Sequence, residues 1–215
     1  MKIATLTLLP GFATIIESMA RILLLIRHAQ TEAQGAGRLI GSTDVHLGER
    51  GKTQAKALAP VLSRMLPESC LCSPLSRARE TAAIAVSGLA LEIEIDPDLR
   101  EVDFGRWEGL SFEEVSALDP QGAERWAVWD RDFAFPGGEA MESFQERVRR
   151  AADRLISTPR QVVLAVTHGG VIRFAICHLL GLTPQQYVLF DVKPASMTVI
   201  QLHGRKGVLS GLYTF

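Results

Sequence analysis

The chain has 215 residues, of which 47% are hydrophobic and 22% are charged, and its formal net charge is −1. This length fits one globular domain with its own hydrophobic core. The near-zero net charge excludes a general positive field for nucleic acid and leaves room only for local positive pockets. The sequence also lacks an uninterrupted apolar run of about 18 residues, so no membrane span is predicted.

Residues 1–18 are expected to be an N-terminal extension, upstream of a single domain over residues 19–215. Met1-Lys2 and the apolar residues that follow resemble a short signal peptide. Pro10-Gly11 interrupts that apolar run early, and Met19 is a natural start for the domain. The extension is therefore favoured over the signal peptide.

Strands and helices are predicted to alternate along the domain. The strands cover residues 21–27, 69–73, 91–95 and 162–166, the helices cover 52–66, 76–86, 143–156 and 171–180, and two or three β-like runs follow within 188–214. The runs 21–27 and 162–166 are apolar throughout, which is typical of strands buried on both faces of a parallel sheet. This order predicts a three-layer α/β/α sandwich with a mostly parallel central sheet.

Two segments stand apart from this alternation. Residues 97–142 are less regular and hold all three tryptophans, so we interpret them as a small cap-like insertion on the core. In the helix that follows, the run Arg147-Val148-Arg149-Arg150 is expected to be a solvated face.

Three cysteines, Cys70, Cys72 and Cys177, leave an odd count, and Cys-Leu-Cys is not a metal-site spacing. We predict buried free thiols, which fit a reducing compartment. A cytoplasmic location is therefore expected.

Two of the apolar strands end in a histidine. His28 follows the strand 21–27, and His168 follows the strand 162–166 by way of Thr167. Because ligands bind at the carboxyl ends of strands in open α/β sheets, the two histidines are candidates for one site. The alternative is that each is a structural residue satisfied by backbone groups.

Groups suited to an anion lie near both histidines. Gly169-Gly170 opens a helix, whose free amide groups attract negative charge and whose glycines allow close approach. Arg27 and Arg77 each lie at a strand end, and guanidinium groups match phosphate oxygens. For Arg77, solvation at the surface is the alternative.

Six motifs follow one another in order between residues 21 and 202. They are Arg27-His28-Ala29-Gln30-Thr31, Gly41-Ser42-Thr43-Asp44-Val45-His46-Leu47, Ser73-Pro74-Leu75-Ser76-Arg77-Ala78, Leu99-Arg100-Glu101-Val102-Asp103-Phe104-Gly105-Arg106-Trp107-Glu108-Gly109, Pro136-Gly137-Gly138-Glu139 and Thr167-His168-Gly169-Gly170. Together they resemble the histidine phosphatase superfamily, the phosphoglycerate mutase-like proteins. Several ordered motifs are more specific than one short pattern.

The resemblance implies a phosphoglycerate mutase-like fold and an enzyme in which His28 attacks phosphorus and becomes phosphorylated. Arg27, Arg77 and His168 would surround the phosphate oxygens, with His168 cationic. Glu101 would protonate the leaving oxygen and later deprotonate the attacking water. No cofactor and no metal ion is expected.

Four further residues are expected to lie near the phosphate. The resemblance implies that Gly169 and Gln34 also bind phosphate, with Gln34 in place of an Asn found in many members. Ala29 replaces a glycine and Gln30 replaces a common glutamate. None of these changes removes a group that the chemistry requires.

The motifs are most similar to those of α-ribazole phosphatases, which implies a phosphomonoesterase for a small phosphorylated metabolite such as α-ribazole 5'-phosphate. The aromatic residues of the cap could stack such a base, although packing is the commoner use of such residues. The alternatives are a mutase-like isomerase, a broad-specificity phosphatase and, from another class, a phospho-ligand binding module. The expected partner is the small substrate, with no nucleic acid and no membrane, and the chain is expected to be a monomer or a homodimer.

Overall fold

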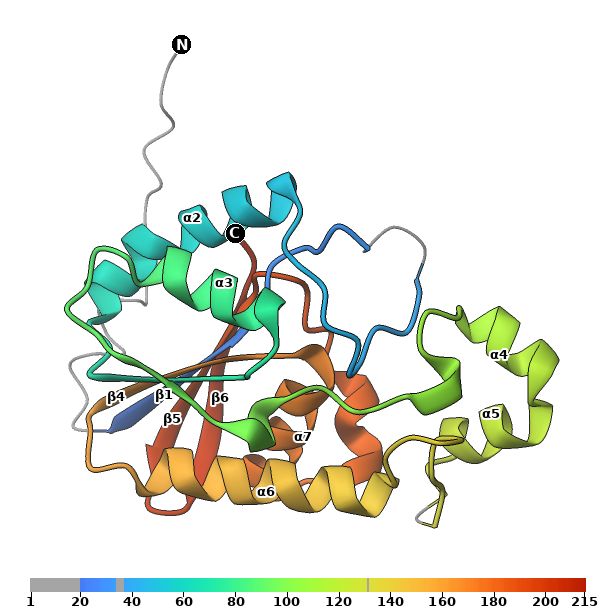
Figure 1. Cartoon of the computed structure of the whole chain (residues 1–215). Coiled ribbons are helices and arrows are strands. Elements are labelled where there is room, and N and C mark those ends of the chain that lie inside the picture. Colours follow the sequence, from blue (N-terminus) through green and yellow to red (C-terminus); the bar gives the residue numbers. More distant parts are fainter. Residues whose placement is uncertain (1–19, 34–36, 131) are drawn as a thin grey trace.

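The computed structural model describes residues 20–33, 37–130 and 132–215. Their strands form one six-stranded sheet in the order β3-β2-β4-β1-β5-β6 (Figure 1). The strands are β1 (Arg21–Arg27), β2 (Ser69–Cys72), β3 (Ile93–Ile95), β4 (Val162–Thr167), β5 (Met197–His203) and β6 (Lys206–Tyr213). The predicted extension over residues 1–18 lies outside the described residues.

Most of the sheet is parallel. β4 pairs in parallel with β1 and β2, and β2 pairs in parallel with β3, whereas β5 and β6 add an antiparallel edge beside β1. Helices cover both faces, with α2 (Glu49–Met65) and α3 (Ser76–Ala85) on one side and α6 (Met141–Ser157) and α7 (Gly169–Leu180) on the other (Figure 1). The predicted three-layer α/β/α sandwich is confirmed.

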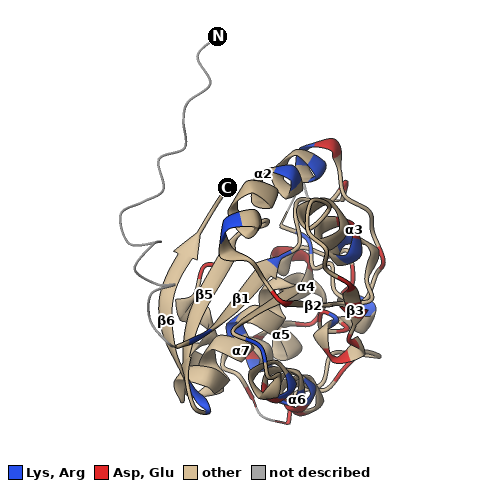
Figure 2. Ribbon diagram, turned by 90° about the vertical axis from the view of Figure 1, so that its left-hand side faces the viewer, with Lys and Arg blue, Asp and Glu red and all other residues tan. Residues whose placement is uncertain are grey.

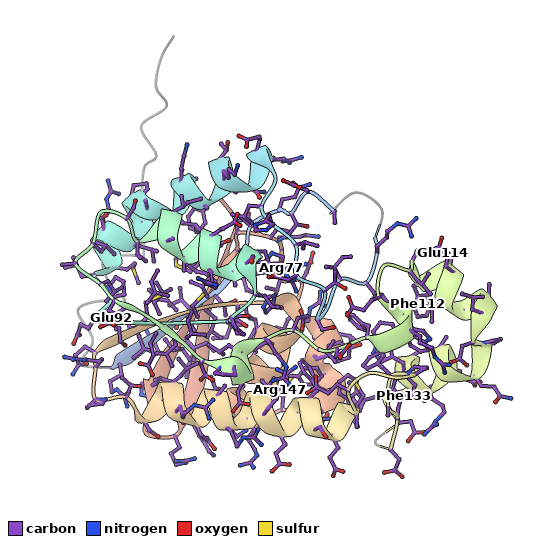
Figure 3. All side chains as sticks on the ribbon, in the orientation of Figure 1. Arg77, Glu92, Phe112, Glu114, Phe133 and Arg147 are labelled. Atoms are coloured by element: carbon purple, nitrogen blue, oxygen red, sulfur yellow. The ribbon has the colours of Figure 1, made fainter. Side chains whose placement is uncertain are left out.

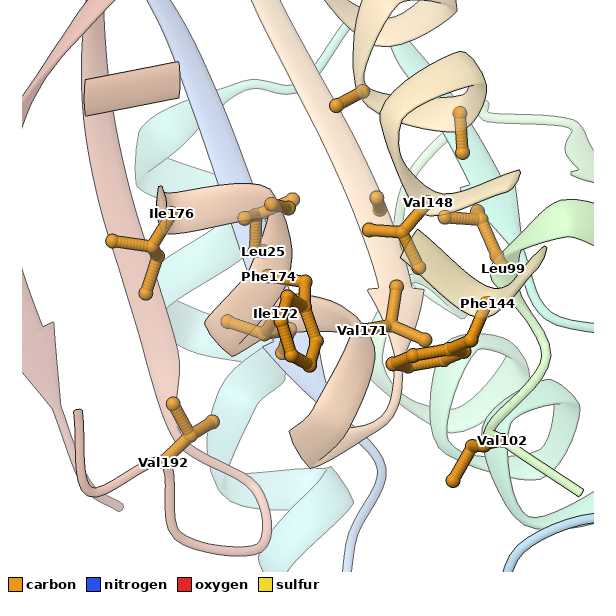
Figure 4. Packing of buried hydrophobic residues seen from close by; sticks show 14 of the residues in the cluster. Leu25, Leu99, Val102, Phe144, Val148, Val171, Ile172, Phe174, Ile176 and Val192 are labelled. Carbon is orange, nitrogen blue, oxygen red and sulfur yellow. The ribbon is translucent and has the colours of Figure 1, made fainter. Parts of the chain in front are cut away.

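The two faces of β1 bury alternate residues in two separate cores. Ile22, Leu24 and Ile26 join the cluster under α2 and α3, while Leu23 and Leu25 join the cluster under α6 and α7. Figure 4 shows Leu25 among apolar side chains of α6 and α7. Because side chains alternate along a strand, a run that is apolar throughout requires cover on both faces.

The segment 97–142 is more regular than the sequence predicts. It contains two short 3-10 helices, η1 (Pro97–Leu99) and η2 (Gly105–Trp107), and two α-helices, α4 (Phe112–Leu118) and α5 (Pro120–Ala127). A capping box of Ser111 and Glu114 begins α4, and Asp119 caps α5. Helices this short show little periodicity, so their caps are the stronger sequence signal. Figure 3 labels Phe112, Glu114 and Phe133 in this segment.

This segment packs directly on the main core. Trp107, Trp129 and Phe135 belong to the same buried cluster as Leu23 of β1. The ring contact between Trp129 and Tyr187 further joins the segment to η3 (Pro184–Leu189). The packing is continuous from the sheet to residues 97–142.

One expectation about α6 is wrong. Arg147 is only 2% exposed, although Arg149 and Arg150 are exposed as predicted. Its guanidinium binds the Glu139 carboxylate and the backbone oxygens of Asp98, Arg100 and Glu101, and these interactions offset the cost of burying its charge. Charge patterning along the helix did not reveal this because the partners come from other segments.

The three cysteines are buried free thiols, as predicted. Burial raises the pKa of Cys70 to about 12 and that of Cys177 to about 11, so both stay protonated near neutral pH. Figure 2 shows charged residues mainly on helices and loops, with the sheet strands tan over most of their length. No helix in the described part of the chain is both long and apolar enough to cross a bilayer.

Candidate active site

The two strand-end histidines lie side by side. β1 and β4 are parallel neighbours in which Arg27 pairs with Thr167, so His28 and His168 leave the sheet at the same level. Their ring centroids are 5.1 Å apart. The structure thus brings together the two residues that the sequence placed at strand ends.

His28 has one ring nitrogen held by the backbone. Its Nδ1 lies 2.8 Å from the carbonyl oxygen of Ala29, and the side chain is 6% exposed. Burial, reinforced by the positive charges of Arg27 and Arg77, holds the pKa of His28 well below its usual value of 6.5. A neutral ring that donates from Nδ1 keeps the lone pair on Nε2, which is the state a nucleophile needs.

Two guanidinium groups flank His28. Arg27 donates from Nη1 to the carbonyl oxygen of Val192 at 2.7 Å, and Arg77 donates to those of Thr43 at 2.8 Å and Gly41 at 2.6 Å. In both side chains the buried Nε has no hydrogen-bond partner among the described residues. Unsatisfied buried donors are costly, so these two groups fit an anion bound between them.

His168 is fully buried at the N-terminus of α7. Its Nε2 lies 2.7 Å from the Ser73 hydroxyl, while its buried Nδ1 has no partner in the described part of the chain. The pKa of His168 lies well below 6.5, mainly because the ring is buried and secondly because the positive charge of Arg77 is near. A neutral His168 is therefore favoured until an anion supplies compensating charge.

Glu101 lies against the first residues of α7. Its carboxylate accepts hydrogen bonds from the N–H groups of Gly170 at 3.0 Å and Val102 at 3.1 Å, and the side chain is 9% exposed. A Cβ on Gly170 would come within 2.5 Å of Glu101 Oε1, and one on Gly169 would lie 3.3 Å from the Arg27 guanidinium carbon. A side chain at Gly170 would therefore have to displace the Glu101 carboxylate, and one at Gly169 would crowd the Arg27 guanidinium.

Two residues that the sequence analysis did not select hold this constellation in place. Arg147 donates to the backbone oxygen of Glu101 at 3.0 Å and is itself fixed by Glu139 at 2.7 Å. Figure 3 labels Arg147 on α6 and Arg77 on the opposite helix layer. The motif Pro136-Gly137-Gly138-Glu139 was the available signal, but its partner could not be found without the fold.

Glu108 is the second such residue. Its carboxylate accepts from the N–H groups of Gly41 at 3.1 Å, Ser42 at 2.9 Å and Thr43 at 3.3 Å, and from the Thr43 hydroxyl at 2.7 Å. The carbonyls of this same loop receive the hydrogen bonds of Arg77. Glu108 thus orders the loop that orients Arg77.

A cavity of about 350 Å³ is lined by Arg27, His28, Arg77, Glu101 and Gly169–Gly170, whereas the fully buried His168 does not line it. Much of its wall is aromatic and consists of two groups of contacting rings: Phe104, Trp126 and Phe135, and Trp129, Phe174 and Tyr187. The rings of each group contact one another, with Phe174 and Tyr187 stacked at 5.1 Å. These rings therefore pack against one another and also form part of the cavity wall.

The remaining predictions for the site concern Gln34 and metal ions. Gln34 lies outside the described residues. Within residues 20–33, 37–130 and 132–215, no group of three His, Cys, Asp or Glu side chains could hold a metal ion. Independence from metal stays a prediction.

Comparison with known proteins identifies relatives over most of the chain. The family model described as histidine phosphatase superfamily (branch 1) matches residues 23–214. Phosphoserine phosphatase 1 of Hydrogenobacter thermophilus is 35% identical over 188 residues, which cover 87% of this chain and 89% of the relative.

Solved structures give the same result. The alpha-ribazole phosphatase of Shigella flexneri superposes with a TM-score of 0.80 at 32% identity, covering 89% of this chain and 95% of that one. The mycobacterial glucosyl-3-phosphoglycerate phosphatase gives 0.79 at 31% identity, covering 89% and 98%. The chain belongs to branch 1 of the histidine phosphatase superfamily and is a phosphoric monoester hydrolase of that family.

Proposed function

We propose that the chain hydrolyses phosphomonoesters through a phosphohistidine on His28. The observation that carries this proposal is the state of His28: neutral, held at Nδ1 by a carbonyl oxygen 2.8 Å away, and flanked by the unpartnered Nε donors of Arg27 and Arg77. This combination places a nucleophile beside a site for the phosphate group that it would attack.

The chemistry proceeds in two steps. In the first, the Nε2 lone pair of His28 forms a bond to phosphorus while the bond to the leaving oxygen breaks, and Glu101 gives its proton to that oxygen. In the second, Glu101 takes a proton from a water molecule that attacks phosphorus, and the N–P bond breaks. Phosphate and the restored Glu101 acid remain.

Charge on the transferred group is balanced by Arg27, Arg77 and His168, with the amide of Gly169 and the side chain of Gln34 as further phosphate contacts. The buried Nδ1 of His168 is available for a phosphate oxygen. Bound phosphate favours the protonated ring, so His168 becomes cationic on binding. This explains why a histidine serves here, since its charge can follow the ligand.

The substrate is a small phosphorylated metabolite. The aromatic wall of the cavity suits a planar leaving group, which makes α-ribazole 5'-phosphate the first candidate. A hydroxy-acid monoester is a second candidate, because the side chain of Arg173 also lines the cavity. The proposed enzyme is one domain over residues 19–215, a monomer or a homodimer, with 97–142 as a cap that shapes this cavity.

The test uses a chromogenic aryl phosphate in the presence of a metal chelator. We expect turnover by the wild type and its loss in His28→Ala, with phosphate trapped on the wild-type protein in rapid-quench samples. Absence of turnover would contradict the proposal and favour a phospho-ligand binding module. Turnover that persists in His28→Ala would assign the nucleophile elsewhere.

A second assay separates hydrolysis from isomerisation. With 3-phosphoglycerate as substrate, we expect free phosphate and no accumulation of 2-phosphoglycerate. Comparing kcat/KM over α-ribazole 5'-phosphate, phosphoserine and sugar phosphates then distinguishes a selective enzyme from a broad-specificity phosphatase.

A further inference from the structure

The backbone that carries His28 passes from the sheet to a hydrogen bond with a side chain of α3. The N–H of His28 still donates to the carbonyl oxygen of Thr167 at 2.8 Å, which continues the pairing of β1 with β4. The next N–H group, that of Ala29, donates to the Thr81 hydroxyl at 3.0 Å. One threonine side chain thus takes over the support of this backbone where the strand ends.

Thr81 lies one helical turn after Arg77 in α3. Its hydroxyl donates to the Arg77 carbonyl oxygen at 2.7 Å and accepts the Ala29 N–H. A hydroxyl has one proton and a carbonyl oxygen can only accept, so the directions of both hydrogen bonds are fixed. Thr81 and Ala29 are both fully buried, so bulk water does not compete for these groups.

The hydrogen bonds continue from Ala29 to the ring of the nucleophile. The Ala29 carbonyl oxygen lies 2.8 Å from Nδ1 of His28, and because a carbonyl accepts, Nδ1 carries the proton. The lone pair then remains on Nε2, the atom that attacks phosphorus in the proposed reaction. Ala29 also packs in the same buried cluster as Ala78 and Ala82 of α3. Its N–H and its methyl group therefore both hold it against this helix.

We propose that Thr81 is a positioning residue for phosphoryl transfer, which holds Ala29 so that its carbonyl oxygen keeps the proton of His28 on Nδ1. This inference rests on the proposed phosphomonoesterase function. Thr81 is not among the residues that line the cavity, so it acts through His28 and not on the substrate.

The side chain of Arg77 is held independently of Thr81. Its guanidinium donates to the carbonyl oxygens of Thr43 and Gly41, whereas the Thr81 hydroxyl binds the backbone of Arg77. Removal of the hydroxyl should therefore affect the attack by His28 more than the binding of phosphate. General destabilisation of the site would affect both.

The test measures two quantities: the rate of phosphohistidine formation from an aryl phosphate in rapid-quench samples, and the inhibition constant of inorganic phosphate. Thr81→Val replaces the hydroxyl with a methyl group of similar size, and Thr81→Ser keeps the hydroxyl. Thr53→Val is the matched control, because Thr53 is exposed and its hydroxyl donates one turn back along α2, to the Glu49 carbonyl oxygen at 3.1 Å.

We expect Thr81→Val to slow phosphohistidine formation about tenfold or more, the effect of one buried hydrogen bond, and to change the inhibition constant by less than about twofold. Thr81→Ser and Thr53→Val should stay within about twofold of the wild type in both quantities. An unchanged rate in Thr81→Val would overturn the inference. A parallel loss of rate and of phosphate affinity would overturn it as well.

NMR of the histidine ring nitrogens near neutral pH reports the tautomer directly. The signals of His28, identified by their absence from His28→Ala, should show the proton on Nδ1 in the wild type and on both nitrogens in part in Thr81→Val. A proton on Nε2 in the wild type, or one that stays wholly on Nδ1 in Thr81→Val, refutes the positioning role. If Thr81→Val does not fold, Thr81→Ala removes the same hydroxyl with a smaller side chain and decides by the same readings.

The wild-type protein keeps the two possible failures apart. If it forms no phosphohistidine on His28, the proposed function fails. If it does, and neither the rate nor the tautomer depends on Thr81, only the present inference fails.

Discussion

Arg147 and Glu139 form a two-point ion pair inside the protein, with Nε–Oε1 and Nη2–Oε2 distances of 2.7 Å. Both side chains are nearly buried, at 3% and 10% exposure. The same guanidinium donates to the backbone oxygens of Asp98, Arg100 and Glu101. The pair therefore joins α6 to the segment that carries the proposed acid of the reaction.

Removing Arg147 should destabilise the whole domain. Arg147→Met leaves the nearly buried Glu139 carboxylate with only the Arg100 guanidinium, at 3.7 Å, as a counter-charge among the described residues and removes the hydrogen bonds to three backbone oxygens, so the free energy of unfolding in urea should fall by about 3 kcal/mol. Arg149→Met, on the exposed face of the same helix, should change it by less than about 0.5 kcal/mol. Equal effects of the two substitutions would contradict a structural role for the buried pair.

Stability should depend on pH through the two buried histidines. The pKa values of His28 and His168 lie well below 6.5 in the folded protein, so below about pH 6.5 the unfolded chain binds more protons than the folded one. The stability is fully present above that pH and is lost as the pH falls toward the folded pKa values. Each histidine contributes at most about 1.4 kcal/mol per pH unit.

Urea unfolding at several pH values between about 5 and 7 measures this slope. His168→Asn should reduce it, while His203→Gln, at an exposed position, should leave it unchanged. A slope that stays the same in His168→Asn would show that this histidine does not titrate differently on folding.

Gly170→Ala should disturb Glu101 specifically. The added Cβ would lie 2.5 Å from Glu101 Oε1, which forces the carboxylate away from its hydrogen bond with the Gly170 amide. Loss of a positioned general acid costs about 10²–10⁴-fold, and more for poor leaving groups than for good ones. We expect alkyl phosphates to suffer more than aryl phosphates, measured as kcat/KM.

Gly88→Ala is the matched control, because a Cβ there meets nothing within 4 Å. It should leave both classes of substrate unaffected. If Gly170→Ala lowers the rate equally for aryl and alkyl phosphates, Glu101 is not the group that protonates the leaving oxygen.

Glu108→Gln should weaken phosphate binding although Glu108 lies behind the site. The amide would present an NH₂ group to backbone N–H donors, so the loop at residues 41–43 would lose part of its support and Arg77 its orientation. We expect the inhibition constant of inorganic phosphate to rise about tenfold, the effect of one charge-assisted hydrogen bond. Glu113→Gln, on the exposed side of α4, serves as the control, and an equal inhibition constant in both variants would refute the role.

Local patterns in the sequence account for the frame of the molecule. Residues 22–26 of β1 are all apolar, so the strand needs cover on both faces. Parallel pairing of β1 with β4, a strand of the same kind, brings His28 beside His168. The two glycines after His168 likewise mark the start of a helix whose free amide groups suit an anion. Strand-end position is a local property, so these features could be predicted without coordinates.

The support of the site depends on contacts between segments far apart in the chain. In the sequence, Arg147 looks like a surface residue of its helix, but folding brings the backbone of residues 98–101 to it. Glu108 looks like any other carboxylate, but folding brings the loop at residues 41–43 to it. Burial of a charge depends on partners that sequence distance does not reveal.

The prediction of His28 as the nucleophile came from the sequence by itself, through the end of an apolar strand and an ordered set of motifs. The neutral state of His28, the unpartnered donors of Arg27 and Arg77, and the place of Arg173 in the cavity wall were decided only by the tertiary structure. The physical reason is that the chemical groups of a residue follow from its type. Its pKa, its burial and its unpaired hydrogen-bond donors depend on neighbours that only the fold brings together.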